Sequence, residues 1–235
     1  MTEVAWDTAM FTEKLRAVGA RAYHDRHPFH VQMNAGELSR EAVQRWIANR
    51  YYYQRCIPQK DAAIIANCSL REVRRMWLHR IVDHDGASGD EGGIEAWLRL
   101  GEAAELPREE LLGERRVVPG VRFAVDAYVN FARTQPWPVA VASSLTELFA
   151  PDLMAARLAA FEKHYTWVAP WGFDYFRRRL TQARRDSDEG LALTIEHCAS
   201  RDLQDAAVRA LDFKCDVLWS VLDAIHGQCA DRPTE

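Results

Sequence analysis

Apolar side chains recur along this chain with the spacing of α-helices, and no stretch shows the convincing alternation that is typical of a β-strand. Proline and glycine interrupt this pattern at short intervals, for example between residues 86 and 93 and between residues 136 and 138. The periodic stretches between the breaks predict helices at residues 7–24, 39–68, 70–83, 91–104, 119–134, 139–148, 152–164, 171–183, 187–198 and 201–226.

Residues that favour the N-cap position stand at the start of three of these helices. The side chains of Ser39, Asp152 and Ser187 can each accept a hydrogen bond from a free backbone N–H of the first turn. The chain contains no internal repeat, no low-complexity tract and no long flexible linker. We therefore expect one all-α domain spanning residues 1–235, built as a helical bundle.

One polar stripe stands out within the second predicted helix. At about 100° per residue, Arg50, Gln54, Ile57 and Asp61 fall on one face, with isoleucines continuing that face on either side. A stripe flanked in this way is expected to point inward. Because a buried, unpaired guanidinium is costly, Arg50 must meet an anion, which is either a carboxylate of the protein or a ligand.

Pro58 lies in the same predicted helix. A proline inside a helix frees a carbonyl group and bends the axis, which is common beside a pocket. An alternative stays open, in which this is an aromatic-rich core helix whose Arg50 and Asp61 pair with neighbouring side chains.

Length and charge narrow the class of protein. A chain of 235 residues buries about 70% of its unfolded surface, which is ample for one core. The formal net charge of −4 gives no reason to expect a general nucleic-acid or membrane-surface binder. The N-terminus has no signal-like apolar segment, and no run approaches the ~20 apolar residues of a membrane span.

Cysteine usage points to the same class. The five cysteines are odd in number, scattered, and without a Cys-x-x-Cys pair, which favours free thiols over disulfides or a zinc site. We expect a soluble protein of the reducing cytoplasm.

Several long motifs resemble the PqqC family of pyrroloquinoline-quinone synthases, which belongs to the haem-oxygenase-like superfamily. They are Asn-Arg-Tyr-Tyr-Tyr-Gln at 49–54, Ile-Pro-Gln-Lys-Asp-Ala-Ala-Ile at 57–64, Asp-His-Asp-Gly at 83–86, Gly-Gly-Ile-Glu-Ala-Trp-Leu-Arg-Leu-Gly-Glu at 92–102, Pro-Gly-Val-Arg-Phe-Ala-Val-Asp-Ala-Tyr at 119–128 and Ser-Ser-Leu-Thr-Glu-Leu-Phe-Ala-Pro at 143–151. The resemblance runs nearly from end to end.

This resemblance implies a compact seven-helix, haem-oxygenase-like fold and a homodimer. It also implies the final step of pyrroloquinoline quinone (PQQ) biosynthesis, an O2-dependent ring closure and eight-electron oxidation of a bicyclic quinone amino acid that bears several carboxylates. The resemblance further implies that no metal or organic cofactor is required, that O2 is the co-substrate, that PQQ is the product and that hydrogen peroxide is released. Such a reaction calls for cations that hold carboxylates, bases that remove protons, and a dry polar spot for dioxygen.

Six basic residues are candidates for holding carboxylates, and the planar fork of arginine suits this role. The resemblance singles out four of them, Arg50, Lys60, Arg179 and Lys214, while most basic residues of such a chain are solvated. The full predicted substrate-binding set is Arg50, Gln54, Lys60, Arg80, Tyr128, Arg157 and Lys214. The basic cluster at residues 177, 178, 184 and 185 is expected to be a solvated face.

Two histidines and one glutamate are the candidate bases. His84 lies at a helix end beside Gly86, and His24 ends the first predicted helix. The resemblance places both histidines at the quinone site, although a histidine in such a position is otherwise often a helix-capping cation. Glu147, on an apolar stretch, is either a proton acceptor or the partner of an arginine.

Tyr175 and Arg179 stand one helical turn apart and can both point into an oxygen pocket. A surface tyrosine stacked on an arginine is the alternative. The resemblance implies a histidine from the helix after Ala-Pro as a third member, but this chain has Met154 there. A thioether neither donates a hydrogen bond nor carries a proton, so oxygen handling in this chain is expected to differ.

Three other functions compete with this one. A di-iron oxidase of the same fold would draw on the histidines at 24, 27 and 30 or on His79, Asp83 and His84, but no Glu-x-x-His pair is present, and we predict no metal site. A non-catalytic PQQ carrier needs only the cations. A thiamin-degrading enzyme of related fold needs an active-site cysteine, and no cysteine here lies in a matching motif.

Overall fold

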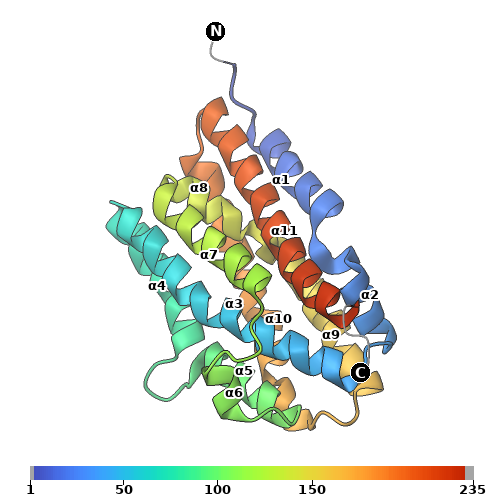
Figure 1. The fold of residues 1–235 in the computed structure, drawn as a ribbon. Coiled ribbons are helices and arrows are strands. Elements are labelled where there is room, and N and C mark those ends of the chain that lie inside the picture. Colours follow the sequence, from blue (N-terminus) through green and yellow to red (C-terminus); the bar gives the residue numbers. More distant parts are fainter. Residues whose placement is uncertain (1–2, 231–235) are drawn as a thin grey trace.

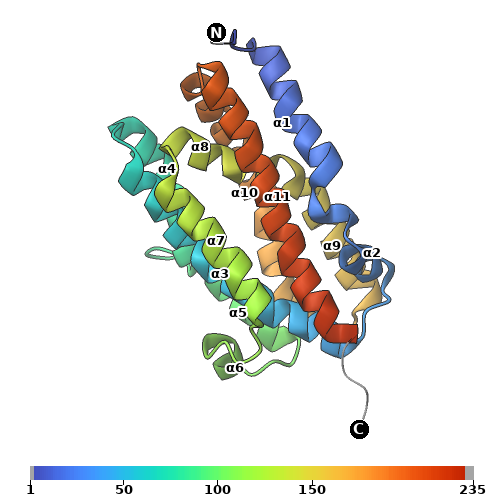
Figure 2. The ribbon, with the colours of Figure 1, turned by 45° about the horizontal axis from the view of Figure 1, so that its top comes forward.

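A computed structural model describes residues 3–230, and these residues are helical almost throughout, with no strand among them. Figures 1 and 2 show the arrangement. The α-helices are α1 Thr8–Ala22, α2 Pro28–Ala35, α3 Arg40–Asn67, α4 Arg71–Asp85, α5 Gly92–Ala103, α6 Arg108–Leu112, α7 Pro119–Thr134, α8 Trp137–Ala142, α9 Ala150–His164, α10 Asp174–His197 and α11 Arg201–Ala230. The 3-10 helices are η1 His24–Arg26, η2 Ser143–Phe149 and η3 Pro170–Phe173.

The long helix α3 passes through the bundle and contacts α4, α5 and α7. On the other side, α11 runs between α7 and α1, as both views show. Helix α10 contacts α9, α8 and η2, which closes the bundle. The all-α prediction is confirmed.

Local chemistry accounts for where several helices begin. Ser39 Oγ accepts a hydrogen bond from the Ala42 N–H at 3.2 Å, so its predicted capping role is confirmed. Asp152 is not an N-cap, because α9 already begins at Ala150. Ser187 does not start a helix either, because it lies inside α10, where its hydroxyl donates to the Arg184 carbonyl at 2.8 Å.

The predicted break between residues 183 and 187 was therefore wrong, and α10 is one helix of 24 residues. The residues between 183 and 187 belong to this helix, and the carboxylate of Asp186 is buried in ion pairs within the bundle. The described residues also contain more than the seven helices expected, because short helices such as α2 and α6 add to the count. The first helix ends before His24, which belongs to η1.

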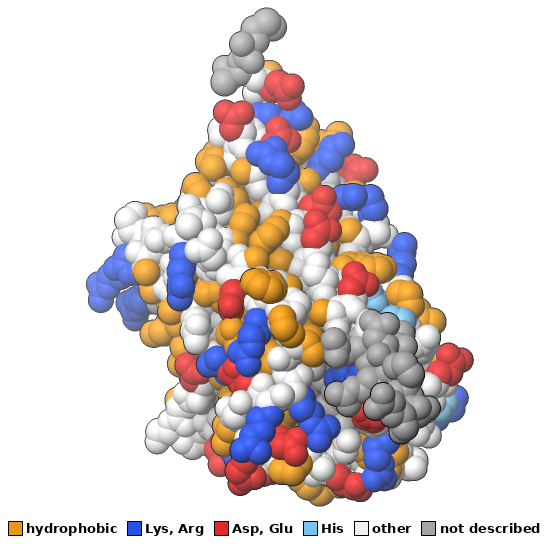
Figure 3. Space-filling model, viewed as in Figure 1, with side chains coloured by type: hydrophobic (Ala, Val, Ile, Leu, Met, Phe, Trp, Pro, Cys, Tyr) orange, Lys and Arg blue, Asp and Glu red, His pale blue; other side chains and the backbone are white. Residues whose placement is uncertain are grey.

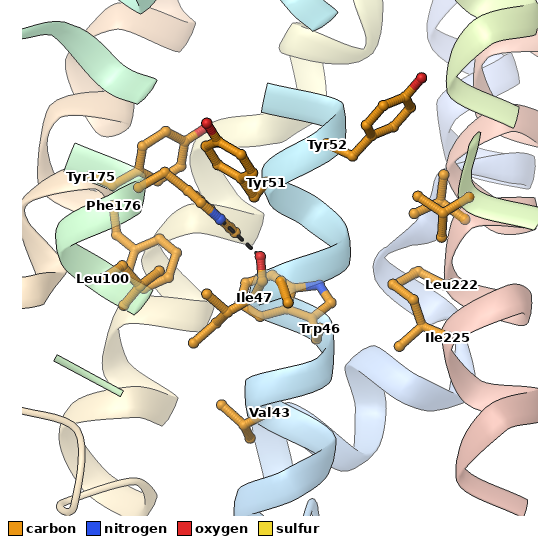
Figure 4. Close-up of a cluster of buried hydrophobic side chains, with 14 of the residues drawn as sticks. Val43, Trp46, Ile47, Tyr51, Tyr52, Leu100, Tyr175, Phe176, Leu222 and Ile225 are labelled. Carbon is orange, nitrogen blue, oxygen red and sulfur yellow. Dashed lines mark hydrogen bonds between the residues drawn. The ribbon is translucent and has the colours of Figure 1, made fainter. Parts of the chain in front are cut away.

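The main core surrounds α3, which carries large apolar side chains on more than one face (Figure 4). Tyr175 and Phe176 from α10 lie on one side of the helix, and Leu222 and Ile225 lie on the other. The indole N–H of Trp97 donates to the Ile47 carbonyl at 3.0 Å and ties α5 to α3. Helix α3 continues through Pro58, which is buried.

One apolar stretch differs from expectation. By length and composition, residues Trp137–His164 would be able to cross a bilayer, although no such run was predicted. In the fold this stretch comprises α8, η2 and α9, and most of its apolar window is buried inside the bundle. Its apolar character therefore has a structural cause, because these side chains belong to the core.

The distribution of surface charge and the state of the described cysteines agree with what the sequence predicts. On the face shown in Figure 3, acidic and basic side chains are interspersed. Arg177, Arg178, Arg184 and Arg185 are exposed, as predicted. The four cysteines whose side chains are described, Cys56, Cys68, Cys198 and Cys215, are free and buried. The side chain of Cys229 lies outside the described residues.

Candidate active site

The polar face of α3 borders a small cavity inside the bundle, with a volume of about 50 Å³. Elements far apart in the sequence contribute to its wall, including η1, α4, η2, α9, α10 and α11. The lining residues are Tyr23, His24, Arg50, Tyr53, Gln54, Ile57, His84, Thr146, Glu147, Ala150, Met154, Tyr175, Arg179 and Leu218. A space of this size holds a few water molecules and is smaller than a typical ligand pocket of roughly 300–1,000 Å³.

The predicted polar stripe does point inward. Arg50, Gln54, Ile57 and Asp61 are all buried, and the first three line the cavity. Asp61 lies one turn further along α3, outside the lining. Its carboxylate accepts hydrogen bonds from Lys60 Nζ at 2.5 Å and from the Trp77 indole N–H at 2.8 Å.

On one side of the cavity, the cations are neutralised by the protein's own carboxylates. Arg179 donates to Glu147 at 2.6 Å and to Asp186 at 3.2 Å. Arg80 lies 3.5 Å from Glu147, 3.4 Å from Asp186 and 3.6 Å from Asp61. These arginines hold the pKa of the Asp186 carboxyl far below its usual range, against the opposing effect of burial.

A second set of buried cations has no carboxylate partner among the described residues. The Arg50 guanidinium lies 4.1 Å from the centre of the Tyr53 ring. Arg157 donates to His30 Nε2 at 2.9 Å, and Lys214 donates to the Tyr53 hydroxyl at 2.7 Å. The Nε atoms of Arg50 and Arg157 have no hydrogen-bond partner.

This second set, comprising Arg50, Arg157 and Lys214, is electrostatically strained. Burial, followed by repulsion from Arg50, lowers the pKa of Arg157 to about 9. The same two causes lower the pKa of Lys214 well below its usual value. Because an anion placed among these groups would relieve the repulsion, the arrangement favours binding a ligand with carboxylates.

His84 presents a basic nitrogen to the cavity. Its Nδ1 lies 3.0 Å from the Arg80 carbonyl oxygen, which only accepts hydrogen bonds, so this nitrogen carries the proton. In the neutral ring, Nε2 then keeps its lone pair. Burial, reinforced by the positive charge of Arg179, lowers the pKa of His84 below 6.5. The ring is therefore neutral at pH 7 and able to accept a proton.

His24 is a buried imidazole without a hydrogen bond at either ring nitrogen. Its ring lies 4.5 Å from that of Tyr23 and 4.9 Å from that of His30. Burial, reinforced by the positive charges of Arg50 and Arg157, lowers its pKa well below 6.5. Such an unsatisfied polar group in a cavity wall is suited to meeting a ligand.

Tyr175, Arg179 and Met154 meet in the cavity wall from α10 and α9. Burial raises the pKa of Tyr175, so its hydroxyl keeps its proton at neutral pH and is able to donate a hydrogen bond. The sulfur of Met154 lies 3.9 Å from a terminal nitrogen of Arg157. The alternative of a surface tyrosine is wrong, because Tyr175 and Arg179 are buried.

The structure brings most of the predicted site residues together. Eight of them line the cavity: His24, Arg50, Gln54, His84, Glu147, Met154, Tyr175 and Arg179. The other five lie outside the lining: Lys60, Arg80, Tyr128, Arg157 and Lys214. Lys60 and Arg80 are occupied by Asp61 and its neighbours, while the Tyr128 ring lies 3.5 Å from Lys214 Nζ.

Sequence reasoning missed three residues that organise the site. Tyr53 receives Lys214 and lies beneath Arg50, and its place beside the polar stripe was a usable signal. Asp186 was placed in a loop and received no role. His30 was considered only as a metal ligand, although its ring holds Arg157.

One group of side chains has the composition of a metal site. His79, Asp83 and Asp186 bring ligand atoms within 4.8 Å of one another. However, Asp186 already lies within ion-pair distance of Arg80, Arg179 and Arg185, and Asp83 is also paired with Arg185. Because several guanidinium groups already surround these carboxylates, their positive charge disfavours the binding of a metal ion.

The chain is similar to known proteins over most of its length. The profile of the TENA/THI-4/PQQC family matches residues 12–224. The pyrroloquinoline-quinone synthase of Pseudomonas aeruginosa (strain LESB58) is 58% identical over 225 residues, which cover 96% of this chain and 90% of that protein. The protein of that name from Cronobacter sakazakii is 60% identical over 215 residues, covering 92% and 85%.

Solved structures show the same fold at low sequence identity. A Shewanella denitrificans domain of unknown function with a heme oxygenase-like fold superposes with a TM-score of 0.75 at 12% identity, covering 97% of this chain and 96% of that one. A TenA homolog from Pseudomonas syringae gives 0.74 at 14% identity, covering 93% and 92%. The predicted haem-oxygenase-like fold is confirmed. Since the family profile spans most of the chain and relatives share more than half of its residues, the chain belongs to the TENA/THI-4/PQQC family.

Proposed function

We propose that this chain is a pyrroloquinoline-quinone synthase. It carries out the O2-dependent ring closure and eight-electron oxidation of a bicyclic quinone amino acid to PQQ, and it releases hydrogen peroxide. Relatives named for this activity are 58% and 60% identical to it. Within the structure, the observation that carries the proposal is the set of three buried cations without carboxylate partners, Arg50, Arg157 and Lys214.

The substrate has several carboxylates, and this set of cations matches them in charge. Binding would replace repulsion among the cations with charge-assisted hydrogen bonds, each worth roughly 1.5–3 kcal/mol. Gln54, from the same polar face of α3, adds an amide that both donates and accepts hydrogen bonds. The acid-neutralised Arg80 and Lys60 then serve mainly to order the wall behind the ligand.

The neutral histidines supply the bases that repeated proton removal requires. The lone pair of His84 Nε2 is the primary acceptor, because the Arg80 carbonyl holds the ring in one tautomer. His24 serves as a second acceptor, since neither of its nitrogens is occupied. Glu147 stays paired with Arg179 and keeps that guanidinium oriented.

Oxygen reduction would take place near Tyr175 and Arg179. A charged guanidinium and a protonated hydroxyl in a desolvated wall stabilise superoxide or peroxide as negative charge develops. Met154 contributes no proton at this spot. The proposed site needs no metal or organic cofactor.

The proposed function also requires that the substrate can enter the cavity. A cavity of about 50 Å³ is too small for a bicyclic ligand, so lining side chains must move for it to bind. A structure with bound PQQ would show which of them move.

The decisive experiment mixes the purified protein with the quinone precursor in air and follows product absorbance and peroxide. Formation of both supports the synthase. PQQ binding without either, by a protein with an intact fold, supports the carrier alternative. Full activity in a strong chelator is expected. Loss of activity in the chelator, with recovery on adding metal, would support the metal-dependent oxidase.

We also infer that the protein is a cytoplasmic homodimer that binds neither nucleic acid nor membranes. The family resemblance supports the dimer, and exposed apolar side chains such as Phe123 and Trp171 offer surfaces for a partner copy to cover. Sedimentation velocity tests the oligomeric state directly, because a monomer at micromolar concentration would contradict the proposed dimer.

A further inference from the structure

His30 joins two parts of the site through its two ring nitrogens. Its Nδ1 lies 2.9 Å from the backbone carbonyl oxygen of His24, and its Nε2 lies 2.9 Å from a terminal nitrogen of Arg157. The side chain is buried, with 1% of its surface exposed. It comes from α2, a helix that the sequence pattern did not reveal.

These two contacts allow only one form of the ring. A carbonyl oxygen only accepts hydrogen bonds, so Nδ1 must carry the proton. A guanidinium only donates, so Nε2 must offer its lone pair. His30 is therefore a neutral acceptor, and a protonated ring would lose the bond to Arg157 and repel it.

The other contacts of Arg157 are also uncharged. The thioether of Met154 lies on one side at 3.9 Å, and the Trp46 ring centre lies 4.9 Å from the guanidinium carbon. Arg179, in contrast, is held by the carboxylates of Glu147 and Asp186. Both arginines are held in place, but only Arg157 keeps its charge uncompensated.

We propose that His30 is a positioning residue that holds Arg157 through a neutral acceptor, so that its charge remains available for a carboxylate of the substrate. A carboxylate in place of His30 would hold the guanidinium equally well and cancel the attraction. This inference rests on the proposed function, because it assigns Arg157 to the acidic ligand of that site.

The test compares isosteric neutral and charged replacements at one position. PQQ is titrated into His30→Gln and His30→Glu, with absorbance or protein fluorescence as the readout. Both side chains can accept a hydrogen bond from Arg157, but only glutamate neutralises it. We expect the Glu variant to bind PQQ on the order of ten- to a hundredfold more weakly than the Gln variant.

A second pair of variants approaches Arg157 from α9. Met154→Gln and Met154→Glu place an amide or a carboxylate beside the same guanidinium. The Glu variant is again expected to bind more weakly. If His30→Glu fails to fold, this pair still shows whether a carboxylate beside Arg157 weakens the binding of PQQ. Val31→Gln and Val31→Glu, at an exposed position on α2, control for the change in net charge, and these two should bind PQQ equally.

The outcomes distinguish a failure of the role assigned to His30 from a failure of the proposed function. Equal affinity within the Gln and Glu pairs, in variants whose circular dichroism is unchanged, would reduce His30 to a packing residue and overturn the inference. In that case the wild-type protein still binds and forms PQQ, and the proposed function stands. If the wild-type protein neither binds nor forms PQQ, the proposed function fails and this inference fails with it.

Discussion

At the scale of single residues, the site separates cations by the charge of their partners. Arg80 and Arg179 meet carboxylates, whereas Arg157 and Lys214 meet an imidazole and a phenol. Sequence reasoning named all four as candidates for holding carboxylates, and the resemblance singled out Arg179 and Lys214 among them. The difference matters because only a cation without a protein anion gains fully from a ligand carboxylate.

His84 and Arg50 are predicted to fail in different ways. His84→Asn should still bind the quinone but slow its oxidation by about 10²- to 10⁴-fold, because the general base is lost. Arg50→Ala should mainly weaken affinity, because it removes a cation from the cavity wall. Binding titrations and single-turnover rates separate the two effects. An equal loss of affinity in both variants would mean that these roles are misassigned.

Met154 provides a prediction about oxygen. Met154→His would place a hydrogen-bonding, proton-carrying ring beside Tyr175 and Arg179, and we expect the late, oxygen-consuming steps to become faster. Stopped-flow absorbance after mixing with oxygenated buffer measures these steps. Single-turnover kinetics identical to those of the wild type would rule out a role for this position in oxygen handling.

The buried histidines predict how stability depends on pH. Burial lowers the pKa of His24, His30 and His84 below 6.5, so the folded chain keeps them neutral where the unfolded chain takes up protons. Their contribution to stability is therefore fully present above about pH 6.5 and is lost as the pH falls below it, by at most about 1.4 kcal/mol per pH unit for each histidine.

Urea unfolding between pH 7 and pH 5 measures this slope. His24→Asn should make it shallower, because one buried histidine is removed. His164→Gln, which removes an exposed histidine, is the matched control. The same slope in all three proteins would contradict the argument.

At the scale of elements, Asp186 connects α10 to α4. Its carboxylate lies within 3.4 Å of both Arg179 and Arg80, and it is 3% exposed. Asp186→Asn leaves two buried guanidinium groups short of an anion and should lower the free energy of unfolding by roughly 3–5 kcal/mol.

Asp83→Asn is the matched control for Asp186→Asn. Asp83 also pairs with Arg185, but nearer the surface, so its loss should cost about 1 kcal/mol or less. Chemical denaturation compares the two variants. Similar losses in both would show that the buried carboxylate has no special role in joining the helices.

At the scale of the whole molecule, we predict that the chain unfolds as one unit. Helices from the beginning, middle and end of the described sequence surround one cavity, and α1 lies against α11. Differential scanning calorimetry should therefore give one transition whose calorimetric and van't Hoff enthalpies agree. Two separable transitions would contradict the single domain predicted for residues 1–235.

The sequence by itself determined the helical class, most helix positions and the inward face of α3. These properties depend on local periodicity and on caps such as Ser39, which act within a few residues. The break predicted around residue 186 was wrong, and the sequence alone does not show that the Asp186 carboxylate is buried in ion pairs with Arg80 and Arg179.

Only the tertiary structure decided which partner each charged group meets. Arg80 and Asp186 are far apart in the sequence, as are His30 and Arg157, and no spacing rule joins them. The charge that remains on a buried cation depends on these long-range contacts, because desolvation and Coulomb interactions depend on position in space. The chemistry of the cavity is therefore a property of the folded chain.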